Sequence, residues 1–123
     1  YGARYFSSLG KFSMYVKDPY IPIHATYLHN STTIALSVSG ENSFTVSHLN
    51  QLKQKGSNII SITNNKHCTI AKMADINISY YVTEEWYKKS NITTQIPVVF
   101  ILEETAREVQ KLSQQMEEKS PEL

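Results

Sequence analysis

The sequence predicts an α/β fold: a doubly wound parallel sheet whose two faces are covered by helices. Two short apolar runs, 32–38 and 58–62, have the length and the β-branched composition of buried strands. The segment between them, 41–55, places its apolar residues on one side of a helix and ends before Gly56. Strands that alternate with helices in this way are typical of parallel sheets.

The remaining elements follow from the same kinds of pattern. In chain order we expect a short or truncated helix at 3–9, a strand at 12–16, a helix at 20–28, a turn of helix at 69–73, a strand at 76–81 and a long helix at 94–116. The segment 12–16 alternates in polarity and is rich in β-forming residues, which favours a strand. The long helix has an apolar face that includes Val98 and Leu102.

The length and the composition describe one ordinary globular domain. The chain has 123 residues, of which 41% are hydrophobic and 19% are charged. Single domains commonly contain about 100–150 residues. We therefore assign residues 1–116 to one domain, and residues 117–123 to a charged tail that is expected to fray.

Charge and composition argue against several classes of function. A net charge of +1 argues against nucleic-acid binding by this segment, because such binding needs concentrated Lys and Arg. No stretch reaches the roughly 18 apolar residues of a membrane helix, and no signal-peptide pattern opens the chain. The lone Cys68 cannot form an internal disulfide, and no spacing suggests a metal site. We therefore expect a cytoplasmic protein with no membrane partner, no metal and no cofactor.

The loop after the first apolar run offers the best candidate for a ligand site. Its residues are Ser37-Val-Ser39-Gly40-Glu41-Asn42-Ser43. In open parallel sheets, ligands bind beyond the carboxyl ends of the strands, where loops meet helix N-termini. The three serines offer hydroxyl donors, and the glycine lets the backbone approach an anion closely. Because the following helix adds N–H groups and a partial positive charge, the loop suits a phosphate dianion.

Two simpler interpretations remain open. The serines and Asn42 would also serve if they only capped the helix, and the residues alone favour this reading, because Ser-Gly turns before helices are common. A second loop, after the run at 58–62, begins with Thr63 and Asn64. These two residues would complete a wall of the pocket or simply form a turn, and the Asn-Asn pair favours the turn.

Candidates for a catalytic group are few. Glu84, Glu85 and His67 are the local candidates for a general base, and none lies in a recognisable motif. Cys68 is expected to be a small, partly buried residue rather than a nucleophile. We therefore name no catalytic residue and expect that the domain is not an enzyme.

At its two loops the chain resembles a SIS (sugar isomerase) domain. Within that superfamily it is most similar to the C-terminal effector domain of the RpiR family of bacterial transcriptional regulators. The resemblance covers about residues 3–115, and four stretches carry it: Ile34-Ala-Leu-Ser-Val-Ser-Gly-Glu41, Lys55-Gly-Ser-Asn-Ile-Ile-Ser-Ile-Thr63, Ile70-Ala-Lys-Met-Ala-Asp-Ile76 and Thr94-Gln-Ile-Pro-Val-Val-Phe-Ile-Leu-Glu103.

The resemblance implies a phosphosugar site at the two loops. Ser37 and Ser39 match the two serines that contact the phosphate in this family. The full set of ligand-binding residues that we expect is Ser37, Ser39, Gly40, Asn42, Ser43, Thr63 and Asn64. Asn42 stands where a Thr is common in the family, and Phe44 stands where an acidic residue is common.

The resemblance also implies a five-stranded, flavodoxin-like parallel sheet and a homodimer formed through the SIS domain. Regulators of this family bind DNA through an N-terminal helix-turn-helix domain, which is absent from this chain. Nothing before Ala3 matches the family's first strand or the Gly/Ser loop that follows it. We therefore expect the domain to be N-terminally incomplete in this sequence.

Three functional hypotheses follow. The favoured one is a sugar-phosphate-sensing domain of a transcriptional regulator, which needs a pocket but no catalytic acid or base. The second is a phosphosugar isomerase of the same superfamily, which would need a positioned Glu or His. The third is a degenerate interaction domain that no longer binds a ligand.

Overall fold

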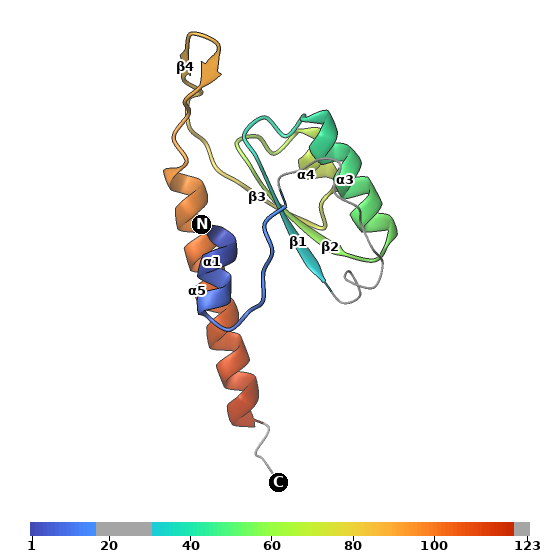
Figure 1. Cartoon of the computed structure of the whole chain (residues 1–123), viewed down its shortest axis with the longest axis vertical. Helices are drawn as coiled ribbons and strands as arrows, with labels where there is room; N and C mark the ends of the chain where they lie inside the picture. The colour runs from blue at the N-terminus through green and yellow to red at the C-terminus, as the bar shows by residue number, and fades with distance from the viewer. Residues whose placement is uncertain (17–30, 120–123) are drawn as a thin grey trace. The chain divides into compact units, whose positions relative to one another are not determined.

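The computed structural model describes residues 1–16 and 31–119, and the chain divides into two compact units (Figure 1). Residues 1–15 and 95–123 form what we call the helical unit, and residues 16–94 form the sheet unit. Each unit is described by itself. The helix expected at 20–28 lies outside the described residues.

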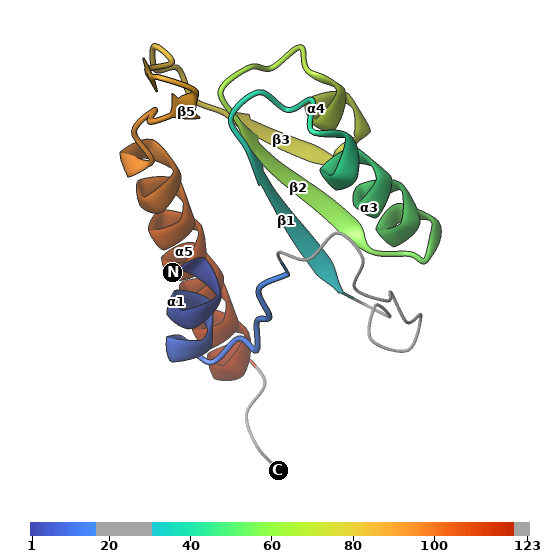
Figure 2. The ribbon, with the colours of Figure 1, turned by 45° about the horizontal axis from the view of Figure 1, so that its top comes forward.

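Three parallel strands form the centre of the sheet unit: β1 (Thr32–Ser37), β2 (Asn58–Thr63) and β3 (Ile76–Ser79), in the order β1-β2-β3. The register sets Ser37 beside Thr63 and Thr63 beside Ser79. The three strands therefore end level with one another, and the loops that follow them leave from the same edge of the sheet (Figure 2). This arrangement confirms the predicted α/β class.

Helices α3 (Ser43–Gln54) and α4 (Thr69–Met73) pack on one face of this sheet (Figures 1 and 2). The core beneath them consists of buried apolar side chains from strands, helices and a loop: Ala35, Leu49, Ile59, Cys68 and Ile70. Alternation along the strands turns Ile34, Ile60 and Ile62 to the opposite face. The opposite face therefore carries isoleucine side chains from β1 and β2, whereas the face under α3 and α4 also buries the polar side chains of Ser61 and Thr63.

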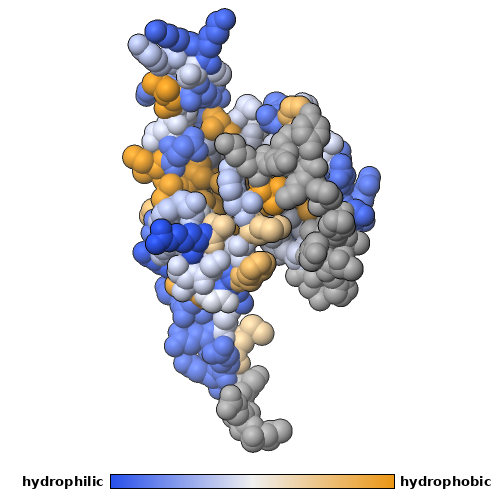
Figure 3. Space-filling view, viewed as in Figure 1, coloured by the Kyte–Doolittle hydropathy of each residue, from blue (hydrophilic) through white to orange (hydrophobic). Residues whose placement is uncertain are grey.

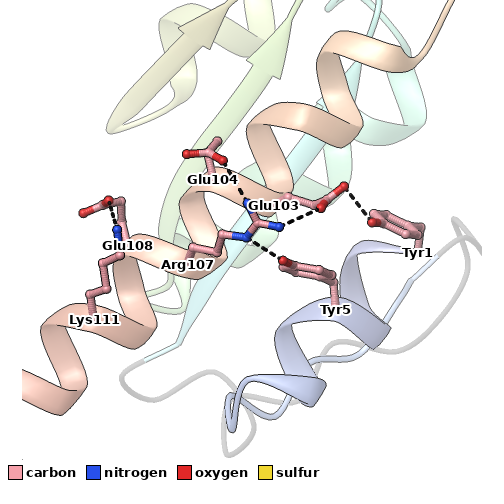
Figure 4. Close-up of polar contacts among 7 residues, drawn as sticks. All are labelled: Tyr1, Tyr5, Glu103, Glu104, Arg107, Glu108 and Lys111. Carbon is pink, nitrogen blue, oxygen red and sulfur yellow. Dashed lines mark hydrogen bonds and ion pairs between the residues drawn. The ribbon is translucent and has the colours of Figure 1, made fainter.

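The helical unit contains α1 (Gly2–Ser8) and the long helix α5 (Ile96–Lys119). Side chains of α5 contact α1 and the residue that precedes it, as Figure 4 shows. Tyr1 Oη donates to Glu103 Oε2 at 2.8 Å, and Arg107 Nε donates to Tyr5 Oη at 2.9 Å. Arg107 also forms an ion pair of 3.5 Å with Glu103. These contacts are exposed, so they orient α1 more than they stabilise it.

A small hairpin, β4 (Trp86–Tyr87) and β5 (Ser90–Asn91), occupies part of the polar stretch for which no regular element was expected. Its turn places Lys88 at a φ of +56°, a conformation that glycine or asparagine usually supplies. No sequence pattern indicated the hairpin, because two-residue strands are too short to show alternation.

The strand expected at 12–16 is wrong. Residues 11–16 have no regular secondary structure, and the side chain of Phe12 is 94% exposed. A strand needs a neighbour that takes up its backbone hydrogen bonds, so β-forming residues alone do not create one. In the described residues the parallel sheet has three strands, whereas the family resemblance implies five.

Other boundaries differ by a few residues. The strand expected at 76–81 ends at Ser79, and α3 begins at Ser43 rather than at residue 41. Helix α5 continues to Lys119, into the segment that was expected to fray. Among the helices of the described segments, none has the length and apolar character needed to cross a membrane.

Candidate functional site

Two loops of the sheet unit meet at the carboxyl edge of the parallel strands. The serine loop, residues 37–43, joins β1 to α3, and the second loop, residues 63–68, joins β2 to α4. Asn64 N of the second loop donates to Val38 O at 3.1 Å, and Ile70 N in the first turn of α4 donates to Gly40 O at 3.0 Å. The fold therefore brings the two predicted parts of the site side by side.

The two serines of the predicted phosphate site fold the serine loop back on itself. Ser37 Oγ accepts from the backbone N–H of Gly40 at 2.9 Å, and Ser39 Oγ accepts from the N–H of Glu41 at 3.2 Å. A hydroxyl group has one donor and two acceptor positions. Within the described part of the chain neither hydroxyl donates a hydrogen bond, so both O–H groups remain able to donate to a ligand.

Gly40 lets this loop lie directly on the second loop. Its φ is +72°, and a Cβ at this position would lie 2.1 Å from Cys68 Sγ and 2.6 Å from Cys68 Cβ. Both the backbone conformation and the lack of space therefore require glycine. The Cys68 thiol is 2% exposed and donates to Asn65 O at 3.1 Å. Cys68 is therefore more completely buried than the partial burial that was expected, and it packs against Gly40 of the serine loop.

Asn42 caps helix α3. Its backbone is extended, and its Oδ1 accepts from Thr45 N at 3.0 Å and from Thr45 Oγ1 at 3.2 Å. The capping interpretation thus holds for this residue. Ser43, which is among the expected ligand-binding residues, is the first residue of the helix and is exposed, and its contact with a ligand stays a prediction.

Glu41 is the residue of this region that sequence reasoning missed. Its Oε1 accepts from Thr69 N at 2.9 Å, and its Oε2 accepts from Thr69 Oγ1 at 2.6 Å. The side chain of Cys68, at the N-cap of α4, makes no cap hydrogen bond, so Glu41 caps α4 from another loop. The two bonds from Thr69, aided by the positive charge of Lys72, lower the pKa of Glu41. The sequence offered one signal for this role: the residue before the predicted helix at 69–73 is Cys68, which does not cap helices, so a cap from elsewhere could have been expected.

The lowered pKa of Glu41 predicts a dependence of stability on pH. A carboxylate whose folded-state pKa lies below its ordinary value contributes stability above that value and loses it as the pH falls through the folded-state pKa. We therefore expect Glu41→Gln to unfold at lower denaturant concentration than the wild type at pH 7. The gap should narrow steadily below about pH 4.3, the ordinary pKa of glutamate. Urea unfolding between pH 7 and pH 3 measures it, and a gap independent of pH would contradict the expectation.

Thr63 and Asn64, the predicted residues of the second loop, have their side chains engaged within the protein. Thr63 is fully buried; its Oγ1 donates to Asn65 O at 2.7 Å and accepts from Asn77 Nδ2 at 3.1 Å. The amide of Asn64 donates to Val82 O and accepts from Val82 N, both at 2.8 Å. Both side chains fix loop backbone, as the turn interpretation expects. A ligand contact by either residue stays a prediction.

Two of the candidates for a general base, Glu84 and Glu85, lie just before the hairpin, and the third, His67, lies in the second loop. Glu84 accepts a hydrogen bond of 3.4 Å from Trp86 Nε1 at the hairpin, and Glu85 and His67 are exposed. Among the side chains at 1–16 and 31–119, no group of three or more His, Cys, Asp or Glu is arranged to hold a metal ion.

The chain matches the model of one protein family and is similar to a transcriptional regulator. The family model of the SIS domain matches residues 1–102. An uncharacterized HTH-type transcriptional regulator of Clostridium perfringens (strain 13 / Type A) is 28% identical over 78 residues, which make up 63% of this chain and 28% of the regulator. The chain thus spans little more than a quarter of that relative.

Two solved structures share the fold. One is E. coli CFT073 c3406 in complex with a sugar-phosphate ligand, with a TM-score of 0.67 and 24% sequence identity. The match covers 92% of this chain and 62% of the E. coli chain. The other, a crystal structure of a hypothetical protein, gives a TM-score of 0.70 at 18% identity, with 92% and 63% covered. The chain therefore spans less than two thirds of each. The family model covers most of the chain and includes both loops, so the chain belongs to the SIS domain family.

Proposed function

We propose that this chain is the sugar-phosphate-sensing effector domain of an RpiR-type transcriptional regulator, and that it binds a phosphosugar at the serine loop. The observation that carries the proposal is the geometry of Ser37 and Ser39. Their oxygens accept backbone N–H groups across a glycine turn, and their hydroxyl protons remain available at the carboxyl edge of the sheet. This is the edge at which open parallel sheets bind ligands.

A phosphate group matches the chemistry of this edge. The dianion accepts hydrogen bonds and carries no donor of its own at neutral pH, so it complements two hydroxyl donors. The N-terminus of α3 adds a partial positive charge, worth about 0.3–2 kcal/mol. Each hydrogen bond to a charged group contributes about 1.5–3 kcal/mol. Most of the affinity should therefore come from the serine hydroxyls rather than from the helix.

The comparisons support the class of ligand and the regulatory role. The E. coli protein that shares the fold was solved in complex with a sugar phosphate. The curated relative is an HTH-type transcriptional regulator, and this chain aligns with 28% of its length. In the proposed protein, a helix-turn-helix domain outside this chain binds DNA in the cytoplasm, and the SIS domain reports the level of a phosphosugar to it.

We further propose that the domain binds its ligand without transforming it. Isomerisation would need a positioned acid or base to move a proton between adjacent carbons. The carboxylate within the serine loop, Glu41, is engaged by Thr69. The hydroxyl of Thr63 is buried and bonded within the second loop. These contacts give Glu41 and Thr63 structural roles within the loops, which is what the proposal of a binding site expects of them.

Calorimetry on the full-length protein tests the proposal. A panel of hexose phosphates and amino-sugar phosphates should contain a ligand that binds, and its unphosphorylated form should bind far more weakly. Equal affinity for both forms would contradict the phosphate site. No heat from any compound, in a folded protein, would favour the degenerate interaction domain. Conversion of the bound sugar phosphate into an isomer would favour the enzyme.

The proposed regulator is a homodimer, and α5 offers the surface for it. Ile96 and Phe100, one helical turn apart, are 76% and 64% exposed, while Val98 and Leu102 are buried. Figure 3 shows hydrophobic surface gathered over the N-terminal part of α5. Exposed apolar residues so arranged are typical of a face that a partner covers.

A charge placed on this surface should weaken the dimer. Burial of a phenylalanine contributes about 1.5–3 kcal/mol, so Phe100→Glu should raise the dimer dissociation constant at least about tenfold. Gln114→Glu adds the same charge at an exposed position of the same helix and should leave the dimer intact. Light scattering at tens of micromolar measures both. A monomeric wild type would contradict the proposal.

A further inference from the structure

We propose that Glu41 is a positioning residue of the serine loop: its carboxylate clasps the first turn of α4 and thereby holds Ser37 and Ser39 in the conformation that binds phosphate. The inference rests on the proposed function and adds to it. It assigns a role to a charged residue whose place in an anion-binding loop is otherwise unfavourable.

The clasp joins two consecutive residues of the serine loop to two consecutive residues of α4. Glu41 accepts from the N–H and the hydroxyl of Thr69, and the carbonyl of Gly40 accepts from Ile70 N at 3.0 Å. The glycine has no room for a Cβ above Cys68, so this part of the loop is in van der Waals contact as well. Three hydrogen bonds and one close contact therefore hold the segment.

The serine geometry depends on the same two residues. Ser37 Oγ is oriented by the N–H of Gly40, and Ser39 Oγ by the N–H of Glu41. Because the clasped residues carry these N–H groups, movement of the clasp would move both hydroxyls. A loop that is held in its binding conformation before the ligand arrives has less conformational entropy to lose on binding.

The electrostatics explain how a carboxylate is tolerated here. A carboxylate beside a bound phosphate would repel it. In the clasp, the carboxylate of Glu41 accepts two hydrogen bonds from Thr69, and the positive charge of Lys72 stabilises its negative charge. Helix α4 has no cap hydrogen bond from Cys68, so the carboxylate also supplies the cap that α4 lacks.

The charge-neutral variant Glu41→Gln separates positioning from simple repulsion, because the two predict opposite signs. If Glu41 were only a nearby anion, removal of its charge would strengthen the binding of a sugar phosphate. If Glu41 positions the loop, affinity should fall several-fold, which is less than for a buried charge-assisted hydrogen bond because the carboxylate is exposed. Thr69→Val, which changes no charge, should weaken binding several-fold. The preference for the phosphorylated over the unphosphorylated sugar should shrink in both variants.

A second readout needs no ligand. Cys68 lies under Gly40 and is almost fully buried, so a thiol reagent such as Ellman's reagent reaches it when the loop opens. Glu41→Gln should raise the labelling rate of the native protein several-fold, because the clasp loses a charge-assisted hydrogen bond that is exposed to solvent. Leu52→Ala, which loosens the packing of α3 away from the loop, is the matched control: it should accelerate labelling only as far as its loss of global stability predicts.

The two readouts distinguish failure of this inference from failure of the proposed function. If no sugar phosphate binds the wild type but Glu41→Gln exposes Cys68, the clasp is real and the proposed ligand is wrong. Tighter phosphate binding by Glu41→Gln, or a labelling rate equal to that of the wild type, would overturn the positioning role.

Discussion

Replacement of both Ser37 and Ser39 by alanine should lower the affinity for the cognate sugar phosphate at least about 100-fold. The change removes two hydrogen-bond donors to a charged group, each worth about 1.5–3 kcal/mol, and each 1.4 kcal/mol is a factor of ten. Calorimetry on the wild type and the double variant measures the loss. The single variants should each show roughly half of it on a logarithmic scale.

Two controls make this result specific. Ser43→Ala removes an exposed hydroxyl at the first residue of α3, and it should weaken binding much less. The double variant also leaves the N–H groups of Gly40 and Glu41 without their serine acceptors, so circular dichroism must show that it remains folded. Unchanged affinity in a folded double variant would place the ligand site elsewhere.

Gly40→Ala should be among the most damaging single substitutions in the sheet unit. The left-handed backbone costs an alanine about 1–2 kcal/mol, and a Cβ forced against a packed side chain typically adds about 1–3 kcal/mol. The clash here is with the buried Cys68, whose Sγ would lie 2.1 Å away. Because total stabilities are about 5–15 kcal/mol, a loss near 3 kcal/mol should be plain in urea unfolding, and phosphate binding should fall with it.

Gly56→Ala is the matched control for this substitution. Gly56 has a φ of +92° but nothing within 4 Å of its added Cβ, so it carries the backbone cost without the clash. It should cost about 1–2 kcal/mol. Cys68→Gly combined with Gly40→Ala should restore part of the loss, because it removes both clashing atoms. If Gly40→Ala and Gly56→Ala proved equally costly, the contact with Cys68 would not matter.

The regular elements of the sheet unit were predictable because their signals are local. The runs that form β1 and β2 are continuous and β-branched, and α3 ends two residues before Gly56, which has a positive φ. Such patterns act over a few residues and need no distant partner. The segment 12–16 is also rich in β-forming residues, but it has no strand to pair with in the described structure, and its large apolar side chains are exposed.

The candidate site divides in the same way. The sequence predicted the position of the site, which lies at the end of a strand and before a glycine turn and a helix. The roles of the individual side chains followed only in part. Asn42 caps α3 through Thr45, as the capping interpretation predicts from the sequence. Thr63 also bonds to Asn77, and Asn64 bonds to the backbone of Val82. Asn77 and Val82 are distant in sequence, so no local pattern indicates these contacts.

The sequence by itself determined the α/β class, the order of strands and helices along the sheet unit, and the loop that bears the serines. Each of these depends on short-range periodicity or on the conformational freedom of glycine. The tertiary structure alone decided that Gly40 rests on Cys68 and that Glu41 caps α4. Glu41 and Thr69 are 28 residues apart in the chain, and they meet because parallel strands of equal register carry their following loops to the same edge of the sheet.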